Sequence, residues 1–421
     1  MTAVVTGLGL FSPLGRGAEE VFAGLIAGKS GIRDIPEGHV LGNSVAFAGL
    51  APEIAATEVL PATEGRMVDR FVLMALAAAD DALADAGLTV GQDVDPERVA
   101  VVVSSGAGGL TTYEAQTLAR AERGHTAVSP YLLPGMLPNM AAARIAIKHG
   151  IQGYSSSIAT ACTASAHAVA EAFRLIQEGH TDVVVCGGSE SPLNPTSALA
   201  FGHARALATN WADPTQASRP FDRRRNGFVL AEGAGVLVVE RAEHAAARGA
   251  GGYADLIGWG ATTDAFKPTT PRPDGAGAAG AMKRAIAVSG LDPADIGYIN
   301  AHGTATKIGD SAEAKAIRAV FGDHHPAVSS TKGQTGHLLG GTGALEAAVS
   351  VLALAKGLLP ATANLEEVGP DCELDHVRGV ARPAAVRAVL SNSFAFGGHN
   401  VSLLFGPAST PKRRGRENDG D

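Results

Sequence analysis

The sequence predicts a layered α/β protein. Short runs of β-branched residues recur along the chain, and Ala-rich stretches with a helical period lie between them. The runs are continuously apolar rather than alternating, which is typical of strands that are buried on both faces of a sheet. Alternation of such strands with helices indicates stacked layers of sheet and helix. A faint internal repeat further suggests two similar halves.

Six apolar runs are the expected strands. They are residues 3–7 (AVVTG), 98–105 (RVAVVVSS), 182–188 (DVVVCGG), 235–241 (GVLVVER), 388–393 (AVLSNS) and 400–406 (NVSLLFG). Residues 68–86 are an expected helix that ends at Gly87, a residue that readily forms a left-handed C-cap. Residues 163–178 are a second expected helix, which has apolar residues near the helical period and ends at Gly179.

The internal repeat pairs two segments of the first half with two of the second. Residues 75–109 and 281–310 share the order helix, Gly-Leu, acidic linker, strand and glycine-containing turn. Residues 160–179 similarly resemble 331–357, where a polar turn leads into an apolar helix. We therefore expect one duplicated body with halves 1–250 and 251–407. Residues 408–421 are polar and mixed in charge, and we expect a disordered tail there.

Composition excludes several classes of protein. The net charge of −8 and the aromatic content of 5% argue against a nucleic-acid partner. The N-terminus lacks the basic region and cleavage site of a signal peptide, and no apolar run is long enough to span a bilayer, so we expect no membrane association. The three cysteines do not form a disulfide framework, which predicts a reducing, cytoplasmic compartment.

Cys162 is the candidate nucleophile. It lies among Ala and Thr residues in SIATACTASAHAVAEA (157–172), where the second expected helix begins. The partial positive charge of a helix N-terminus should lower the thiol pKa from its usual value of about 8.5. The ordinary alternative is an inert buried cysteine, and we assign Cys186 and Cys372 to that class.

Three further motifs carry polar groups suited to chemistry. His302 follows an apolar strand in NAHGTATKIGD (300–310), together with Thr304 and Thr306. Lys332 and His337 lie in VSSTKGQTGHLLGGTGALEAA (328–348). The third motif, SNSFAFGGHN (391–400), is a glycine-hinged loop after an aromatic residue. Each motif also has an ordinary structural explanation: a core histidine, a surface lysine or a core-filling phenylalanine. For Lys332, the Ser, Thr and Gly neighbours favour burial in an ion pair, with Glu313 as one candidate partner.

The order Cys, HGTxT, KxxxGH and NSFxFGG resembles that of the β-ketoacyl-[acyl carrier protein] synthases, elongating ketosynthases of the thiolase superfamily. The resemblance runs from VVTGLGLFSPLG to SLLFG and thus covers nearly the whole chain. It implies a thiolase-like duplicated α/β fold, with helix/sheet/helix/sheet/helix layers and pseudo-two-fold halves. It also implies decarboxylative Claisen condensation of an acyl-enzyme thioester with malonyl-ACP, in fatty-acid or type II polyketide elongation. CO2 and 3-oxoacyl-ACP would be the products.

The resemblance implies a role for each motif. Cys162 would be acylated, and His302 and His337 would bind the malonyl thioester. Lys332, paired with Glu313, would support the site. The backbone N–H groups of Cys162 and Phe396 would form an oxyanion hole, and Phe396 would also act as a gate. In this chain Ala395 and His399 replace the Gly and Thr of many relatives, which leaves the flexibility of the gate open.

The resemblance also implies binding regions and partners. Thr269, Thr304 and Thr306 would line the tunnel for the phosphopantetheine arm of an acyl carrier protein, and no cofactor of the chain's own is expected. Phe201 and residues 134–140 resemble the acyl pocket and dimer interface. A structural Na⁺ or K⁺ would be held by Asn300, Glu346, Ser391 and Asn392. The dimer partner would be an identical copy or a chain-length-factor-like homologue. Arg66, Arg70 and Arg205 are candidates for a local basic patch that binds the acidic carrier.

Other functions remain as alternatives. Gly7 and Gly9 form an incomplete dinucleotide-binding fingerprint, because position 12 is serine. A thioester hydrolase would pair Cys162 with a histidine and an orienting Asn300 or Asn400. A non-catalytic scaffold subunit of a ketosynthase heterodimer would hold an active partner. No group of His and Cys residues has the spacing of a metal site.

Overall fold

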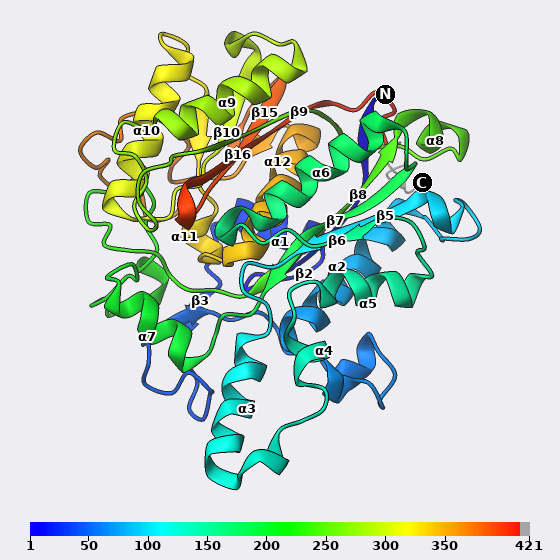
Figure 1. Cartoon of the computed structure of the whole chain (residues 1–421). Coiled ribbons are helices and arrows are strands. Elements are labelled where there is room, and N and C mark those ends of the chain that lie inside the picture. The colour runs from blue at the N-terminus through cyan, green and yellow to red at the C-terminus, as the bar shows by residue number, and fades with distance from the viewer. Residues whose placement is uncertain (413–421) are drawn as a thin grey trace, which may run out of the picture.

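The computed structural model describes residues 1–412, whose main feature is one long sheet with helices layered against it (Figure 1). The first half contributes five neighbouring strands in the spatial order β1 (Ala3–Ser12), β8 (Gly233–Arg241), β7 (Val183–Glu190), β5 (Val99–Ser104) and β6 (Ser155–Ser156). The second half continues from β1 in the opposite direction with β9 (Ala254–Thr263), β16 (His399–Pro407), β15 (Ala388–Phe394), β10 (Ile296–Asn300), β11 (Ala327–Ser329) and β13 (Asp375–His376).

The two halves repeat the same strand pattern. In the first, β1–β8 and β8–β7 are antiparallel, whereas β7–β5 and β5–β6 are parallel. In the second, β9–β16 and β16–β15 are antiparallel, whereas β15–β10 and β10–β11 are parallel. A short antiparallel ladder between β1 and β9 joins them, with Ala3 opposite Leu256. The predicted duplicated α/β fold is therefore confirmed.

Helices make the remaining layers. Helices α2 (Arg70–Ala86) and α5 (Met140–His149) cover the outer face of the first half, and α9 (Ala276–Ser289) and α10 (Lys307–Phe321) cover that of the second. Helices α6 (Ala164–Glu178) and α12 (Thr342–Lys356) pack against each other between the two halves of the sheet (Figure 1). Because α6 follows Cys162 and α12 follows His337, this central layer brings the candidate residues of both halves together.

Smaller elements complete the fold. They are β2 (Gly15–Arg16), α1 (Ala18–Ile26), β3 (Ile32–Asp34), β4 (Phe47–Gly49), α3 (Leu110–Arg123), α4 (Leu132–Met136), α7 (Pro195–His203), α8 (Ala242–Ala247), α11 (Lys332–Thr335), β12 (Leu358–Leu359) and β14 (Arg382–Pro383). All six predicted strands and both predicted helices are present. Gly87 and Gly179 cap the two helices with φ values of 57° and 75°, in the left-handed conformation that we expected.

Glycines inside β1 allow α2 to pack directly on the strand. A Cβ atom at Gly7 would overlap the carbonyl oxygen of Ala82, and one at Gly9 would overlap that of Ala78. Gly7 and Gly9 thus lie within β1 and serve helix packing, rather than forming the turn after a strand that binds a dinucleotide. The oxidoreductase interpretation was therefore wrong.

Glycines of β9 play the same part in the second half. Gly258 and Gly260 lie under the carbonyl oxygens of Ala285 and Ala281 in α9. The sequence did not predict β9, because these glycines interrupt its run of β-branched residues.

The residues after β16 continue along the body of the protein. Ser409 N–H donates to Asp255 Oδ2 at 3.0 Å, and Lys412 Nζ lies 2.7 Å from Asp85 Oδ1. The predicted disordered tail is therefore wrong for residues 408–412, because these contacts fasten them to β9 and α2. Residues 413–421 lie outside the described residues.

One described segment, Leu339–Lys356, is apolar and long enough to cross a membrane by composition alone. Buried residues make up 83% of it, since it includes the central helix α12. The segment is accounted for as a core element of the fold.

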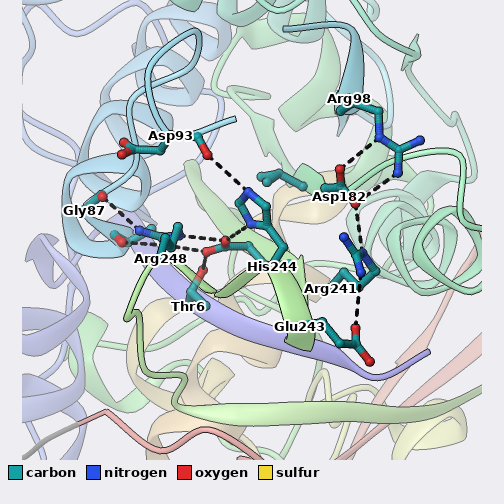
Figure 2. A network of polar contacts seen from close by, with 12 residues as sticks. Thr6, Gly87, Asp93, Arg98, Asp182, Arg241, Glu243, His244 and Arg248 are labelled. Carbon is teal, nitrogen blue, oxygen red and sulfur yellow. Dashed lines mark hydrogen bonds and ion pairs between the residues drawn. The ribbon is translucent and has the colours of Figure 1, made fainter. Parts of the chain in front are cut away.

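A buried polar network fastens α8 to the first half. Glu240 accepts hydrogen bonds from Thr6 (2.5 Å), His244 (2.7 Å) and Arg248 (2.5 Å). Figure 2 shows Thr6, His244 and Arg248 converging at this point, with Arg248 also reaching the carbonyl of Gly87 at the end of α2. The network ties together β1, β8, α8 and α2.

Candidate active site

A cavity of about 600 Å³ lies between the two halves. Nine of the ten predicted catalytic and substrate-binding residues line it: Cys162, Phe201, Thr269, His302, Thr304, Thr306, Glu313, His337 and Phe396. Lys332 is buried outside the lining, and residues 134–140 do not contribute to this cavity. The structure therefore brings together residues that are up to 234 positions apart in the sequence, from Cys162 to Phe396.

Cys162 lies in a single turn, Ala161–Thr163, directly before α6. Ala161 has a φ of 50°, which is unfavourable for a residue with a Cβ atom. The equivalent turn of the other half precedes α12 and contains Leu339, with a φ of 45°. Such strained backbone persists only where its surroundings hold it, and it is concentrated at functional sites.

The structure changes our expectation for the Cys162 thiol. Burial raises the pKa of Cys162 to about 12, although the Lys332 charge and the N–H groups of Cys162 and Phe396 act in the opposite direction. The predicted lowering of this pKa was wrong, because the loss of hydration outweighs the Lys332 charge and the two N–H groups. Cys162 is a thiol at neutral pH and needs a proton acceptor when it reacts.

The two histidines face each other across the cavity. Their ring centroids lie 5.3 Å apart, and the ring planes are inclined by 81°. His302 follows the end of β10, and His337 lies between α11 and α12. Burial and the nearby Lys332 charge hold the pKa of both imidazoles well below the ordinary value of 6.5. Both rings are therefore neutral at pH 7, and each can act as a donor or an acceptor.

Thr342 orients the ring of His337. Its Oγ1 lies 2.9 Å from His337 Nδ1, at the first residue of α12. A hydroxyl proton donated to Nδ1 places the imidazole proton on Nε2, where it can be donated to a ligand. Thr342 was not predicted from the sequence, although it lies five residues after His337 at the start of an apolar helix.

Lys332 pairs with Glu346 and not with Glu313. Its Nζ lies 2.6 Å from Glu346 Oε1 and donates to the carbonyl of His302 at 2.5 Å. Burial raises the pKa of Glu346, and the Lys332 charge opposes this shift. The predicted Lys332–Glu313 pair is wrong, because α12 places the Glu346 carboxylate beside the lysine.

Glu313 instead holds the backbone after β10. Its carboxylate accepts the N–H groups of His302 and Gly303, both at 2.8 Å. Burial raises the pKa of Glu313 to about 7, and the two N–H donors oppose the shift. Lys332 thus fixes the carbonyl of His302 while Glu313 fixes its amide.

Phe396 lies on a loop between β15 and β16, with its side chain next to Phe201. The two ring centroids are 6.3 Å apart, and Phe396 is 37% exposed. Gly397 follows with a φ of 84° and donates its N–H to the carbonyl of Pro268 at 2.6 Å. This contact links the glycine loop to the segment that carries Thr269.

His399 supports the same loop from the other side. Its ring lies against Gly397, where an added Cβ atom would be 3.0 Å from the ring. It also meets the edge of His167 in α6, with 6.3 Å between centroids. His167 Nδ1 in turn contacts Thr160 Oγ1 at 2.9 Å, just before Cys162. The loop that carries Phe396 is thereby connected to the turn that contains Cys162.

Polar and cationic residues line the outer part of the cavity. The hydroxyl groups of Thr304 and Thr306 lie 3.1 Å apart. Arg205, Arg272 and Lys307 line the same cavity. We had predicted only Arg205 of these three, although Lys307 directly follows the HGTAT motif.

The other two arginines predicted for the basic patch lie elsewhere. Arg70 is engaged with Glu232 at 2.8 and 2.9 Å, and its side chain is 24% exposed. Arg66 is exposed and lies over the ring of Tyr131 at 5.6 Å. Arg70 is therefore unsuited to carrier binding, because the buried carboxylate of Glu232 already occupies its guanidinium.

The predicted cation set contains unsatisfied oxygen atoms. Asn300 and Ser391 are paired across β10 and β15. The side-chain oxygen of Asn300 and Oε2 of Glu346 are buried without a hydrogen-bond partner. Oxygen ligands of this kind suit a hard cation, so these residues fit the expected group. Across residues 1–412, no group of three or more His, Cys, Asp and Glu side chains has the geometry of a metal site.

A duplicated α/β body, with a half-buried cysteine and two neutral histidines in one cavity, defines a thiolase-like acyltransferase. Comparison with known proteins makes this specific. Residues 2–245 match the family model "Beta-ketoacyl synthase, N-terminal domain", and residues 253–366 match "Beta-ketoacyl synthase, C-terminal domain". The chain belongs to the beta-ketoacyl synthase family, which confirms the resemblance inferred from its motifs.

Curated relatives extend over the full length. A 3-oxoacyl-[acyl-carrier-protein] synthase 2 from Synechocystis sp. is 42% identical over 404 residues, which are 96% of this chain and 97% of the relative. A relative of the same name from Vibrio harveyi is 41% identical over 405 residues, 96% of this chain and 97% of the relative. The chain is therefore an enzyme of the acyltransferase class.

Solved structures agree on the fold. The ishigamide ketosynthase/chain length factor superposes with a TM-score of 0.90 at 33% identity, covering 96% of this chain and 99% of the other. A beta-ketoacyl synthase from Burkholderia phymatum superposes with a TM-score of 0.89 at 33% identity, covering 98% and 100%. A type II polyketide ketosynthase in complex with its acyl-carrier protein superposes with a TM-score of 0.89 at 29% identity, covering 96% and 99%.

Proposed function

We propose that this protein elongates an acyl chain by decarboxylative Claisen condensation with malonyl-ACP. The observation that carries this proposal is the convergence of Cys162, His302 and His337 on one cavity, with both imidazoles neutral. CO2 and a 3-oxoacyl-ACP are the products, in fatty-acid or type II polyketide elongation.

The first half-reaction loads Cys162. A neutral imidazole in the cavity accepts the thiol proton as the sulfur attacks the acyl thioester. The N–H groups of Cys162 and Phe396, which act on the sulfur in the free protein, then stabilise the oxyanion. Collapse of this intermediate leaves the acyl group on Cys162 and expels the carrier thiolate. The thiolate takes the proton back from the imidazolium and leaves as a thiol, which restores the neutral imidazole.

The second half-reaction uses the two histidines as donors. N–H groups of His302 and His337 bind the malonyl thioester oxygen, where negative charge develops as CO2 leaves. The resulting enolate carbon attacks the Cys162 thioester, the new C–C bond forms, and the C–S bond to Cys162 breaks. The Cys162 thiolate takes up one proton from solvent, which replaces the proton that left with the carrier thiol, and is ready for another cycle.

The carrier supplies the only prosthetic group in this scheme, a phosphopantetheine arm. Thr269, Thr304 and Thr306 line the cavity, which supports their proposed contact with this arm. Arg205, Arg272 and Lys307 add positive charge along the same path, which suits an anionic arm on an acidic carrier. The relative solved with its acyl-carrier protein supports this partner.

We further propose a cytoplasmic dimer with halves 1–250 and 251–407 in each subunit. Strand β6 lies at the edge of the sheet, and Tyr154 beside it is 48% exposed, which leaves this edge available to a second subunit. The partner is an identical copy or a chain-length-factor-like homologue. Asn300, Glu346, Ser391 and Asn392 would hold a structural Na⁺ or K⁺, which stabilises the fold without entering the reaction.

Two alternative functions can be separated by experiment. A scaffold subunit would keep full activity in the assembled complex when Cys162 is replaced, so Cys162→Ala should abolish condensation if the proposal holds. A thioester hydrolase would release free acid without consuming malonyl-ACP. Mass spectrometry of the protein after incubation with acyl-ACP should show an acyl group on Cys162 and none on the Cys162→Ala variant.

A further inference from the structure

Glu190 is a buried carboxylate that the proposed reaction does not use. It lies at the end of β7 and is 1% exposed. Its Oε1 accepts from Ser105 Oγ at 2.7 Å and from Ala107 N–H at 3.1 Å. Its Oε2 accepts from the N–H groups of Gly106 at 2.6 Å and Gly340 at 3.1 Å. Both oxygens therefore have two donors each.

All four partners donate hydrogen bonds to Glu190, so they stabilise an ionised carboxylate. Three of the four are backbone N–H groups, which can only donate, and the serine hydroxyl supplies the fourth proton. A glutamine at this position would place its NH2 group against such donors. Burial raises the pKa of Glu190, and the four donors oppose that shift.

The donors belong to both catalytic halves. Gly106 packs against the Cys162 turn (Ala161–Thr163), since a Cβ atom at Gly106 would lie 3.4 Å from Cα of Ala161. Gly340 belongs to the second half and follows Leu339, in the turn after His337. One carboxylate thus joins the turn of Gly340 to residues 105–107, which pack against the Cys162 turn. Both turns contain a non-glycine residue with positive φ, Leu339 in one and Ala161 in the other.

The packing around the bridge leaves no space for adjustment. A Cβ atom at Gly340 would overlap both Oε2 of Glu190 and the amide nitrogen of Gly106. Residues 105–107 and the Gly340 turn therefore meet at the carboxylate at a fixed distance, with Gly106 on one side and Gly340 on the other.

We propose that Glu190 is a positioning residue, which sets the spacing of Cys162 and His337. It does so by hydrogen-bonding both the turn of Gly340 and residues 105–107, the segment that packs against the Cys162 turn. Its effect on condensation rests on the proposed function, whereas its effect on the thiol can be measured without any substrate.

The test compares Glu190→Gln and Glu190→Asp with the wild-type protein. The first readout is the pH dependence of Cys162 alkylation by iodoacetamide, because the Glu190 charge raises the thiol pKa. The second is the condensation rate with acyl-ACP and malonyl-ACP.

For Glu190→Gln we expect the alkylation midpoint to move to lower pH, because a negative charge is removed. Condensation should fall about 100-fold, as expected when catalytic groups are displaced by about 1 Å. Glu190→Asp keeps the charge but is too short to reach all four donors. It should keep an alkylation midpoint near that of the wild type and still lose condensation.

Glu240→Gln is the matched control, because Glu240 is an equally buried glutamate in the network of Figure 2. It should lower the free energy of unfolding and leave the alkylation midpoint unchanged. The proposal is overturned if Glu190→Gln keeps both the wild-type alkylation midpoint and the wild-type condensation rate. It is also overturned if Glu190→Gln, like Glu240→Gln, lowers only the free energy of unfolding and leaves the alkylation midpoint unchanged. If the wild type does not condense at all, the proposed function fails, and the alkylation shift still decides the role of Glu190.

Discussion

The rings of His302 and His337 lie 5.3 Å apart and almost perpendicular to each other, although the residues come from different segments of the second half. Lys332 and Glu313 hold the backbone of His302, and Thr342 orients the ring of His337. These contacts fix the positions of the two rings before a substrate arrives. Burial and the nearby lysine keep both rings neutral, so each carries one N–H group that can donate. Such preorganised donors are effective where negative charge develops.

The neutral state of the histidines predicts the pH dependence of malonyl-ACP decarboxylation. A histidine with a depressed pKa stays neutral as the pH falls through 6.5, its ordinary value. We expect no histidine titration step in the decarboxylation rate near pH 6.5, and a loss of rate through histidine protonation only at lower pH. Because the pKa of Glu313 is raised to about 7, Glu313→Gln is measured beside the wild type. A step centred near pH 6.5 that both proteins share, measured as CO2 release between pH 5.5 and 8, would show that an ordinary histidine controls the reaction.

The buried ion pair of Lys332 and Glu346 should contribute strongly to stability. Glu346→Ala leaves the lysine charge buried without its partner, and we expect a loss of about 3–5 kcal/mol in the free energy of unfolding. Lys356→Ala is the control, because its ion pair with Glu19 is exposed. That variant should lose less than about 1 kcal/mol in the same urea titration. Equal losses of stability in the two variants would contradict the conclusion that burial makes the loss of the Lys332–Glu346 pair more costly.

Direct packing of helices on glycine-containing strands should make β1 intolerant of side chains. Gly9→Ala forces a Cβ atom into the carbonyl oxygen of Ala78, so we expect a loss of at least about 1–3 kcal/mol in the free energy of unfolding. Gly202→Ala is the matched control, because no heavy atom lies within 4 Å of its added Cβ in α7. Thermal unfolding should show it as stable as the wild type or slightly more stable.

The network around Glu240 should make stability depend on pH through His244. The hydrogen bond to Glu240 raises the pKa of His244, and the same contacts lower the pKa of Glu240. Protonated His244 therefore stabilises the folded state fully below pH 6.5, and this contribution disappears as the pH rises through the raised folded-state pKa. Glu240 stays ionised over this window, because its contribution is lost only at acid pH, as the pH falls through its lowered pKa.

The measurement is the difference in urea stability between wild type and His244→Gln. It should be largest near pH 5.5 and smallest near pH 9. A difference that grows with rising pH would contradict the assigned ion pair.

Local signals predicted much of the fold. Continuous β-branched runs identified six strands, and Gly87 and Gly179 marked the ends of two helices, because these features depend on neighbouring residues alone. Strand β9 was not predicted, because glycines interrupt its apolar run. These glycines allow α9, which follows in the sequence, to pack closely on the strand. Its role became visible only from the packing of Gly258 and Gly260 against α9.

The candidate site was predicted as a set of residues, but not in its contacts. Cys162, His302 and His337 stand at turns beside strand or helix ends, where local sequence is informative. The partner of Lys332 depends on how α12 lies against the second half, and the pKa of Cys162 depends on burial by residues distant in sequence. Neither the partner of Lys332 nor the pKa of Cys162 can be deduced from spacing along the chain. Thr342 and Glu190 were missed for the same reason.

A single-turnover reaction tests the central claim most directly. Protein acylated on Cys162 is mixed with malonyl-ACP, and the mass of the carrier-bound product is measured together with released CO2. We expect a 3-oxoacyl-ACP two carbons longer than the loaded acyl group and one CO2 for each turnover. His337→Ala should retain the acyl group on Cys162 and release no CO2. Release of free acid while malonyl-ACP remains intact, or equal loss of acylation and decarboxylation in His337→Ala, would contradict the account.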